Sequence, residues 1–160
     1  MKVEQISTVI KESKPPFTPL LIISQEENGK ANVMVVEWYM RCSAQPPMYA
    51  ISIGLSRHTH KCLEQVRLFN IIAPTSSMTD IVKYCGSHSG REVDKFAELN
   101  LDTFKGKLGL PIIKNANASL ECKIVSQILS GDHTIFIGEV KHSWLNHESS
   151  PLVLYPKNNE

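Results

Sequence analysis

The stretch that decides the fold runs from Leu20-Leu21-Ile22-Ile23-Ser24 through Glu26-Glu27-Asn28-Gly29-Lys30 to Ala31-Asn32-Val33-Met34-Val35-Val36. Two runs of apolar and β-branched residues are separated by a short link that contains Asn-Gly. Asn-Gly between alternating apolar runs is the strongest short-range signal of a β-hairpin. We therefore predict that strands over 20–24 and 31–40 pair antiparallel.

Further short apolar runs follow the same punctuation by Gly, Pro, Asn and Ser. They predict strands over 49–53 and 69–73, and a pair of long strands over 118–129 and 134–144 joined by Ser130-Gly131-Asp132-His133. Strands at this spacing are typical of a barrel or a sandwich. The chain is thus expected to be mainly β, in a single domain over residues 1–160.

Three short helices are predicted between the strands. The first follows Ser56-Arg57-His58-Thr59, with Ser56 or Thr59 as its N-cap and Cys62 and Val66 on one side. The others cover 77–84 and 91–99, the last one capped by Ser89 or Gly90.

Composition excludes several classes of protein. Lys plus Arg at 17 against Asp plus Glu at 16 leave a net charge of +1, without the basic excess that attracts nucleic acid. The start, Met1 to Gln5, does not resemble a targeting segment, and no apolar run approaches the roughly 20 residues of a membrane helix. We expect a soluble, cytoplasmic protein that binds neither nucleic acid nor membrane.

Four cysteines, Cys42, Cys62, Cys85 and Cys122, are too far apart for a Cys-x-x-Cys motif. They are interpreted mostly as buried thiols without disulfides, as in a reducing compartment. His58 and His60 have no carboxylate or thiol at a spacing that completes a metal site, so no metal is predicted. Gly-x-Ser-x-Gly, Walker and Gly-x-Gly-x-x-Gly motifs are absent from the sequence, and catalysis is expected to depend on a bound cofactor.

Ser56-Arg57-His58-Thr59-His60-Lys61 is the richest candidate for binding chemistry. A helix start offers free N–H groups and a positive dipole end, and Arg57, Thr59 and Lys61 could add hydrogen bonds to a phosphate. The alternative is a capped helix with solvated basic residues. Apart from any role in binding, Trp38 can be interpreted as barrel core, the commoner place for a Trp on a strand. Glu37, within an apolar run, must face solvent, a partner or a ligand.

Taken together, these segments resemble the flavin reductase-like, FMN-binding split-barrel family from about Pro16 to Tyr155. Two further blocks carry the resemblance. They are Ser89-Gly90-Arg91-Glu92-Val93-Asp94-Lys95-Phe96, similar to flavoredoxins, and Gly131-Asp132-His133-Thr134-Ile135-Phe136-Ile137-Gly138-Glu139-Val140, which also recurs in reductase components of two-component monooxygenases.

The resemblance implies a homodimeric split β-barrel with FMN bound between strands, helix start and partner. It places the flavin ring against the backbone from Asn32 to Trp38 and the phosphate at the first helix. The implied cofactor-binding residues are Asn32, Val33, Met34, Val35, Trp38, Ser52, Ser56, Arg57, Thr59, Lys61, Ser89, Gly90 and Lys95, with His133 on the nicotinamide side. His133 could instead bond its own turn.

Two positions depart from the family pattern. Val35 stands where a Thr or Ser is common, and Glu37 where a small residue is common. Losing a hydroxyl at Val35 would weaken flavin binding by roughly 0.5–1.5 kcal/mol if that bond is normally made.

The resemblance leaves three functions open. The first is an NAD(P)H-dependent FMN reductase, in which hydride passes from nicotinamide to flavin. The second is a flavoredoxin-like electron carrier with tightly bound FMN, and the third is a barrel that has lost flavin and only binds a partner. The electron acceptor would be an oxygenase component or another redox protein, and the apolar tail from Pro151 to Tyr155 offers a surface for the dimer.

Overall fold

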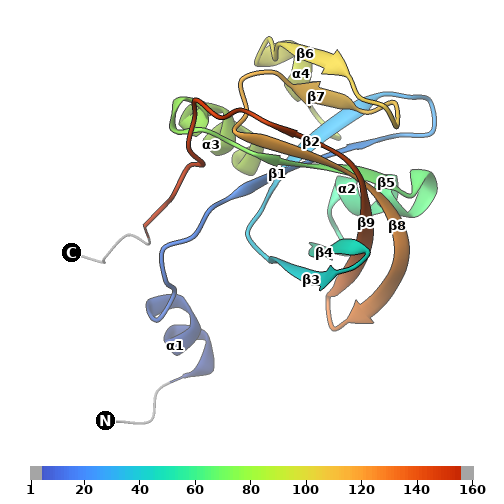
Figure 1. Ribbon diagram of the computed structural model, residues 1–160. Coiled ribbons are helices and arrows are strands. Elements are labelled where there is room, and N and C mark those ends of the chain that lie inside the picture. The colour runs from blue at the N-terminus through green and yellow to red at the C-terminus, as the bar shows by residue number, and fades with distance from the viewer. Residues whose placement is uncertain (1–4, 156–160) are drawn as a thin grey trace.

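The predicted hairpin is present in the computed structural model, which describes residues 5–155 (Figure 1). Strand β1 covers Leu20–Gln25 and pairs antiparallel with β2, Ala31–Val36. In the turn, the Gly29 N–H donates to the Glu26 carbonyl at 2.9 Å, and Gly29 has a φ of +87°. Residues that carry a side chain rarely adopt a positive φ, so the glycine of Asn-Gly allows this turn to close.

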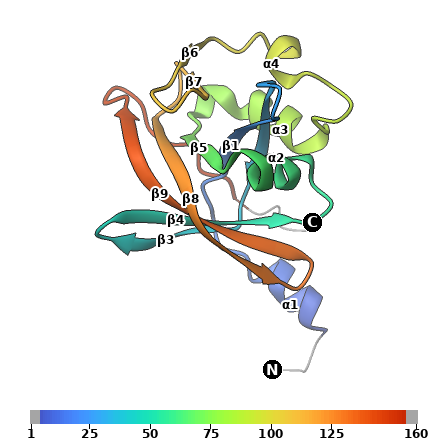
Figure 2. The same ribbon diagram turned by 90° about the vertical axis from the view of Figure 1, so that its right-hand side faces the viewer.

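Five further strands complete one antiparallel sheet in the order β2-β1-β5-β8-β9-β4-β3. They are β3 (Tyr39–Ala44), β4 (Pro47–Gly54), β5 (Leu68–Ala73), β8 (Ala118–Ser130) and β9 (His133–Leu145). The edge strands β2 and β3 follow each other directly in the chain, so the sheet curls until its edges approach. The result is a mainly β, split β-barrel, crossed by the long β8–β9 hairpin (Figure 2).

One predicted strand was wrong in extent. The run over 31–40 is divided at Glu37 and Trp38, because β2 pairs with β1 whereas β3 pairs with β4 at the opposite edge. The amide of Ser52 donates to the Trp38 carbonyl at 2.9 Å and holds the corner between the two strands.

The helices agree only in part with the prediction. Helix α2 covers His58–Val66, and a 3₁₀ turn at Ser76–Met78 leads into α3, Thr79–Ser87. The helix predicted over 91–99 is reduced to α4, Lys95–Glu98, because the Asp94 side chain accepts the N–H groups of Phe96 and Ala97. Asp94 is therefore the N-cap, and the prediction of Ser89 or Gly90 was wrong.

Three elements were not predicted. Helix α1 covers Ile6–Glu12 and projects away from the barrel (Figure 1). Strands β6 (Thr103–Lys105) and β7 (Pro111–Ile113) form a small separate hairpin.

The core has two parts on the two faces of β1, which explains why its apolar run is continuous. Ile22 packs inside the barrel with Ile51, Phe69 and Phe136. The alternate residue Leu21 packs outside it, in a cluster with Val82 and Cys85 of α3. This outer cluster fixes α3 beside β2.

The predicted apolar tail packs mainly on its own chain. Leu152 is buried in the outer cluster and Leu154 pairs with Phe17, while Val153 and Tyr155 are exposed. Residues 1–4 and 156–160 lie outside the described part of the chain, and this includes most of the start, Met1 to Gln5, in which no targeting segment was predicted.

Cys62, Cys85 and Cys122 are buried as predicted, and Cys42 is exposed. Burial raises the pKa of the Cys85 thiol to about 11 and that of Cys122 to about 12. Among residues 5–155 no helix is both long and apolar enough to cross a membrane.

Candidate functional site

A cavity of about 460 Å³ lies between β2, the start of α2 and the segment after α3. This volume is within the range of small-molecule and cofactor sites. Its lining residues are Asn32, Met34 and Val35 of β2, residues 56–59, residues 85–92, and Lys95. The cavity therefore brings together most of the residues that the resemblance assigned to the cofactor.

The start of α2 has free hydrogen-bonding capacity toward this cavity. Arg57 is the N-cap, with an extended backbone and no side-chain hydrogen bond to the first turn. The predicted N-caps Ser56 and Thr59 were wrong, because Thr59 lies within the helix and is buried. An uncapped helix start beside an arginine favours an anion.

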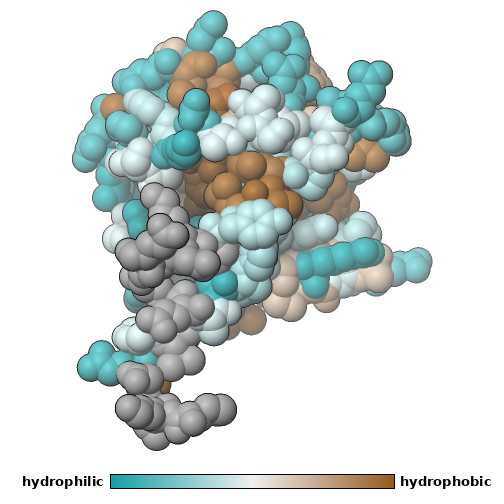
Figure 3. Space-filling view, turned by 90° about the vertical axis from the view of Figure 1, so that its left-hand side faces the viewer, coloured by the Kyte–Doolittle hydropathy of each residue, from teal (hydrophilic) through white to brown (hydrophobic). Residues whose placement is uncertain are grey.

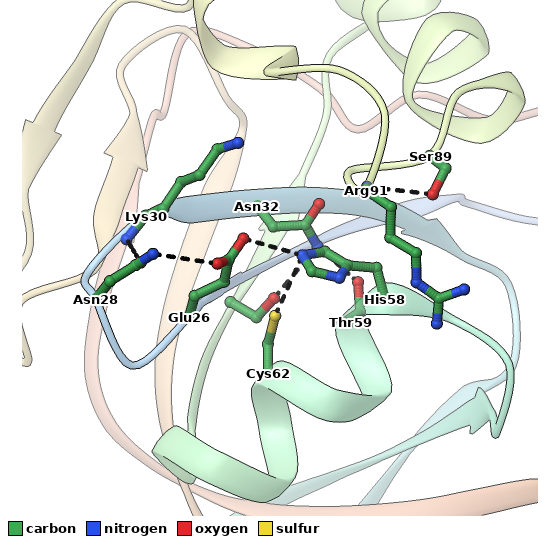
Figure 4. Close-up of polar contacts among 10 residues, drawn as sticks. Glu26, Asn28, Lys30, Asn32, His58, Thr59, Cys62, Ser89 and Arg91 are labelled. Atoms are coloured by element: carbon green, nitrogen blue, oxygen red, sulfur yellow. Dashed lines mark hydrogen bonds and ion pairs between the residues drawn. The ribbon is translucent and has the colours of Figure 1, made fainter.

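Asn32 fixes the hydroxyl group of Thr59. Its Nδ2 donates to Thr59 Oγ1 at 2.8 Å and approaches Ser24 Oγ at 3.4 Å (Figure 4). Because the Thr59 oxygen already accepts one hydrogen bond, its own proton remains to be donated elsewhere. The Asn32 amide thus orients Thr59 as a donor beside Arg57.

Gly90 closes the cavity against the same amide. A Cβ atom built on Gly90 would lie 2.9 Å from Asn32 Cγ and closer still to its Oδ1. Only glycine allows the segment after α3 to approach β2 this closely.

Lys95 is buried in the cavity wall. Its Nζ donates to the Val33 carbonyl at 3.0 Å and to the Cys85 carbonyl at 2.9 Å, joining β2 to α3. Burial lowers the pKa of Lys95. An ammonium has three donors, so one N–H remains for a ligand.

Arg91 and His88 were not among the predicted site residues. Arg91 Nη2 donates to the Ser56 carbonyl at 2.9 Å, which ties the segment after α3 to the start of α2. The His88 ring stacks on Tyr84 at 3.9 Å between centroids. Arg91 belongs to the Ser-Gly-Arg block that carries the family resemblance, but its contact with residue 56 is not visible in a sequence.

Lys61 does not reach the cavity. It lines a smaller neighbouring hollow of about 200 Å³ together with Glu26, Glu27, Asn28, His58, Cys62 and Gln65. Of these residues only His58 lines both spaces, and its Nε2 lies 3.2 Å from Glu26 Oε1.

Three other predicted residues lie outside the cavity lining. The Val33 side chain is buried in the outer cluster, although its carbonyl holds Lys95. Trp38 is 61% exposed, so it is not barrel core, and its ring lies 4.6 Å from that of His133. Ser52 lies on β4 opposite Ile135.

His133 also makes a contact within its own turn, which is the alternative role that the sequence allowed. Its Nδ1 lies 2.7 Å from Asp132 Oδ1, and this hydrogen bond lowers the pKa of the Asp132 carboxyl group.

The two positions that depart from the family pattern differ in placement. Val35 lines the cavity, whereas Glu37 forms an ion pair with Lys14.

Within residues 5–155 no group of three or more His, Cys, Asp or Glu side chains is arranged to hold a metal ion. The chemistry that this arrangement supports is the binding of an elongated ligand with an anionic end. The anion would meet Arg57 and the α2 start, and the rest of the ligand would lie along β2.

The chain is similar over most of its length to known proteins. Residues 16–159 match the family model described as flavin reductase like domain. An uncharacterised protein of Archaeoglobus fulgidus is 35% identical over 128 residues, which are 79% of this chain and 71% of the relative. An NADH-dependent FAD reductase of Streptomyces globisporus is 31% identical over 85% of this chain and 72% of its own length.

A solved structure shares the fold over nearly the whole chain. The FMN-binding protein from Thermus thermophilus with bound p-hydroxybenzaldehyde superimposes with a TM-score of 0.85 at 28% identity. The match covers 98% of this chain and 91% of that structure.

Proposed function

The chain belongs to the flavin reductase like family, and on that premise we propose that it binds FMN in the 460 Å³ cavity and works as an NAD(P)H-dependent flavin reductase. The observation that carries the proposal is the uncapped start of α2, with Arg57 beside it, opening into a cavity lined by β2. The FMN-binding and NADH-dependent relatives support the choice of cofactor and electron donor.

The residues present fit FMN. Arg57, the Ser56 hydroxyl and the Thr59 hydroxyl can hold the phosphate, and the edge of β2 from Asn32 to Val35 can hold the ring. The third N–H of Lys95 is free for a ring atom or its side chain. When bound, the flavin supplies the redox chemistry, accepting hydride from a nicotinamide and passing electrons onward.

The chain itself would position the flavin and the nicotinamide and supply the electrostatic field around them. The ties from Arg91 to Ser56 and from Lys95 to β2 hold the two walls of the cavity at a fixed separation. The rings of Trp38 and His133 lie 4.6 Å apart at a tilt of 36°, with Trp38 exposed, and we propose that a nicotinamide approaches there. Electrons would leave for an oxygenase component or another redox protein.

The remaining parts of the proposal concern the whole chain. We propose one domain, a homodimer and a cytoplasmic location, where four free thiols remain reduced.

An absorbance titration tests the function. Purified protein is mixed with FMN, then with NADH and with NADPH without oxygen. Binding should shift the absorbance bands of the flavin and quench its fluorescence. Reduction by a nicotinamide should then bleach the absorbance bands of the oxidised flavin. Bound flavin that is bleached only by a strong chemical reductant would instead identify a flavoredoxin-like electron carrier, and an unchanged spectrum with FMN would contradict flavin binding.

Arg57→Ala and Lys61→Ala form a matched pair for the phosphate. Arg57 lines the cavity and Lys61 lines the neighbouring hollow, although both carry one positive charge near the start of α2. We expect Arg57→Ala to weaken FMN binding by about 1.5–3 kcal/mol, the value of a charged hydrogen bond. Lys61→Ala should change it by less than about 0.5 kcal/mol, and equal losses in the two dissociation constants would move the phosphate toward Lys61.

A further inference from the structure

The cavity and the neighbouring hollow share one lining side chain. His58 lines both, at the end of the cavity where Arg57 and Thr59 lie. A ligand whose phosphate occupies the start of α2 would therefore lie beside the His58 side chain, whose contacts with Glu26 and Cys62 are drawn in Figure 4.

The His58 ring has close neighbours at Glu26, Cys62 and Gly90. Glu26 Oε1 lies 3.2 Å from its Nε2, and Cys62 Sγ lies 3.8 Å from the same atom. On the cavity side, a Cβ atom built on Gly90 would lie 3.2 Å from His58 Cδ2. The side chain is only 15% exposed, so it forms a fixed wall.

The hollow behind this wall has an acidic lining. Its carboxylate beside His58 is that of Glu26, which is partly buried, whereas Glu27 is exposed and its charge is screened by solvent. A second phosphate that passed His58 would face Glu26 directly, and juxtaposed like charges disfavour binding.

FMN and FAD differ beyond the first phosphate. FMN ends there, whereas FAD continues through a second phosphate to adenosine. We propose that the His58–Glu26 pair is the specificity-determining element of this cavity, which closes it behind a single terminal phosphate and selects FMN over FAD. The inference rests on the proposed flavin function and adds which flavin the chain prefers and why.

Calorimetric titration with FMN and with FAD tests the pair. Wild-type protein should bind FMN at least about tenfold more tightly than FAD, a difference of about 1.4 kcal/mol. His58→Ala removes the wall, and Glu26→Gln keeps the shape of the wall but removes the negative charge. In both variants the FAD-to-FMN ratio of dissociation constants should fall at least about threefold, through tighter FAD binding.

Glu27→Gln is the matched control, since Glu27 lines the same hollow, is exposed, and has no hydrogen bond to His58 among the contacts of residues 5–155. Its ratio should stay within about twofold of wild type. Circular dichroism verifies that each variant is folded. If His58→Ala does not fold, Glu26→Gln still tests the proposal.

The results separate the two proposals. Absence of FMN binding by the wild-type protein would overturn the flavin function itself. Normal FMN binding with equal affinity for FAD, or a ratio that is unchanged in Glu26→Gln and in folded His58→Ala, would overturn only the selective role of the pair. An equal change in Glu26→Gln and Glu27→Gln would likewise overturn it, because the effect would then not depend on contact with His58.

Discussion

At position 90 the space between the cavity wall and Asn32 admits only a hydrogen atom. The methyl group of Gly90→Ala would overlap the Asn32 amide, which orients Thr59. Overpacking of this kind typically costs about 1–3 kcal/mol. We expect the free energy of unfolding in urea to fall by that amount, and FMN binding to weaken because Thr59 loses its hydrogen-bond partner.

Gly86→Ala is the matched control for this prediction. Gly86 lies within α3, and a Cβ atom there would meet only Val35 Cγ2, at an ordinary 3.7 Å. Alanine in a helix is more stable than glycine by roughly 0.5–1 kcal/mol. The same added methyl group should therefore stabilise the protein at residue 86 and destabilise it at residue 90, and two changes of the same sign would contradict the steric role of Gly90.

Two residues of the Ser56–Lys61 motif face different spaces because of the geometry of the helix. Thr59 and Lys61 were both assigned to the phosphate from the sequence, but two residues along a helix correspond to about 200° of rotation. Thr59 consequently faces β2 and the cavity, whereas Lys61 faces the neighbouring hollow. Arg57 precedes the helix and keeps its predicted place beside the cavity.

At the scale of elements, β2 and α3 are joined through a buried lysine. Lys95→Met would leave the Val33 and Cys85 carbonyls without their partner in a buried environment. An unsatisfied buried group costs about 1–3 kcal/mol. We expect the free energy of unfolding to fall by at least that amount, measured by urea denaturation at neutral pH.

Lys83→Met is the control, because it also removes one lysine charge, in this case from an exposed position on α3. The Lys83 side chain is 73% exposed and contacts only Asp80, at 3.4 Å, among the ion pairs of residues 5–155. Its loss should change the free energy of unfolding by less than about 0.5 kcal/mol. A similar loss in both variants would mean that the contribution of Lys95 is its charge alone and not its hydrogen bonds.

Local sequence signals predicted the elements whose causes are local. Asn28-Gly29 and the turn at Ser130-Gly131 placed two hairpins, because glycine with positive φ closes each of them. The division of the 31–40 run at Glu37 depends on pairing with strands distant in sequence, and apolar periodicity cannot reveal it. The cavity likewise depends on residues 85–92 folding back onto β2, so family resemblance, rather than periodicity, brought Ser89, Gly90 and Lys95 into the predicted site.

At the scale of the whole molecule, helices α2, α3 and α4 pack mainly on β1 and β2, away from β3 (Figure 2). The strands at the β3 end of the sheet carry exposed apolar side chains, among them Met40 and Ile128. Met40 lies opposite Ala50, which lies opposite Ile137 on the next strand, and Ile128 lies opposite Ile135. Residues directly opposite each other share one face of a sheet. These side chains therefore form one apolar strip across β3, β4, β9 and β8.

Exposed apolar surface also gathers in the middle of the face that Figure 3 shows. The tail predicted to form the dimer surface contributes less than expected to any such surface, because Leu152 is buried in its own chain and Leu154 pairs with Phe17. The strip on the sheet is the other candidate, since it runs across four neighbouring strands.

Two charge substitutions decide between these surfaces for the proposed homodimer. Wild-type protein in light scattering after size exclusion should show twice the chain mass of 17.9 kDa. Ile128→Glu, at a side chain that is 54% exposed, should yield monomer with an unchanged circular dichroism spectrum, because a buried unpaired carboxylate opposes association at the strip. Val153→Glu, 45% exposed on the tail, should remain dimeric. Monomer from Val153→Glu with dimer from Ile128→Glu would move the interface to the tail, and a wild-type mass of one chain would contradict the homodimer; in that case the cavity would have to bind flavin with the residues of a single chain.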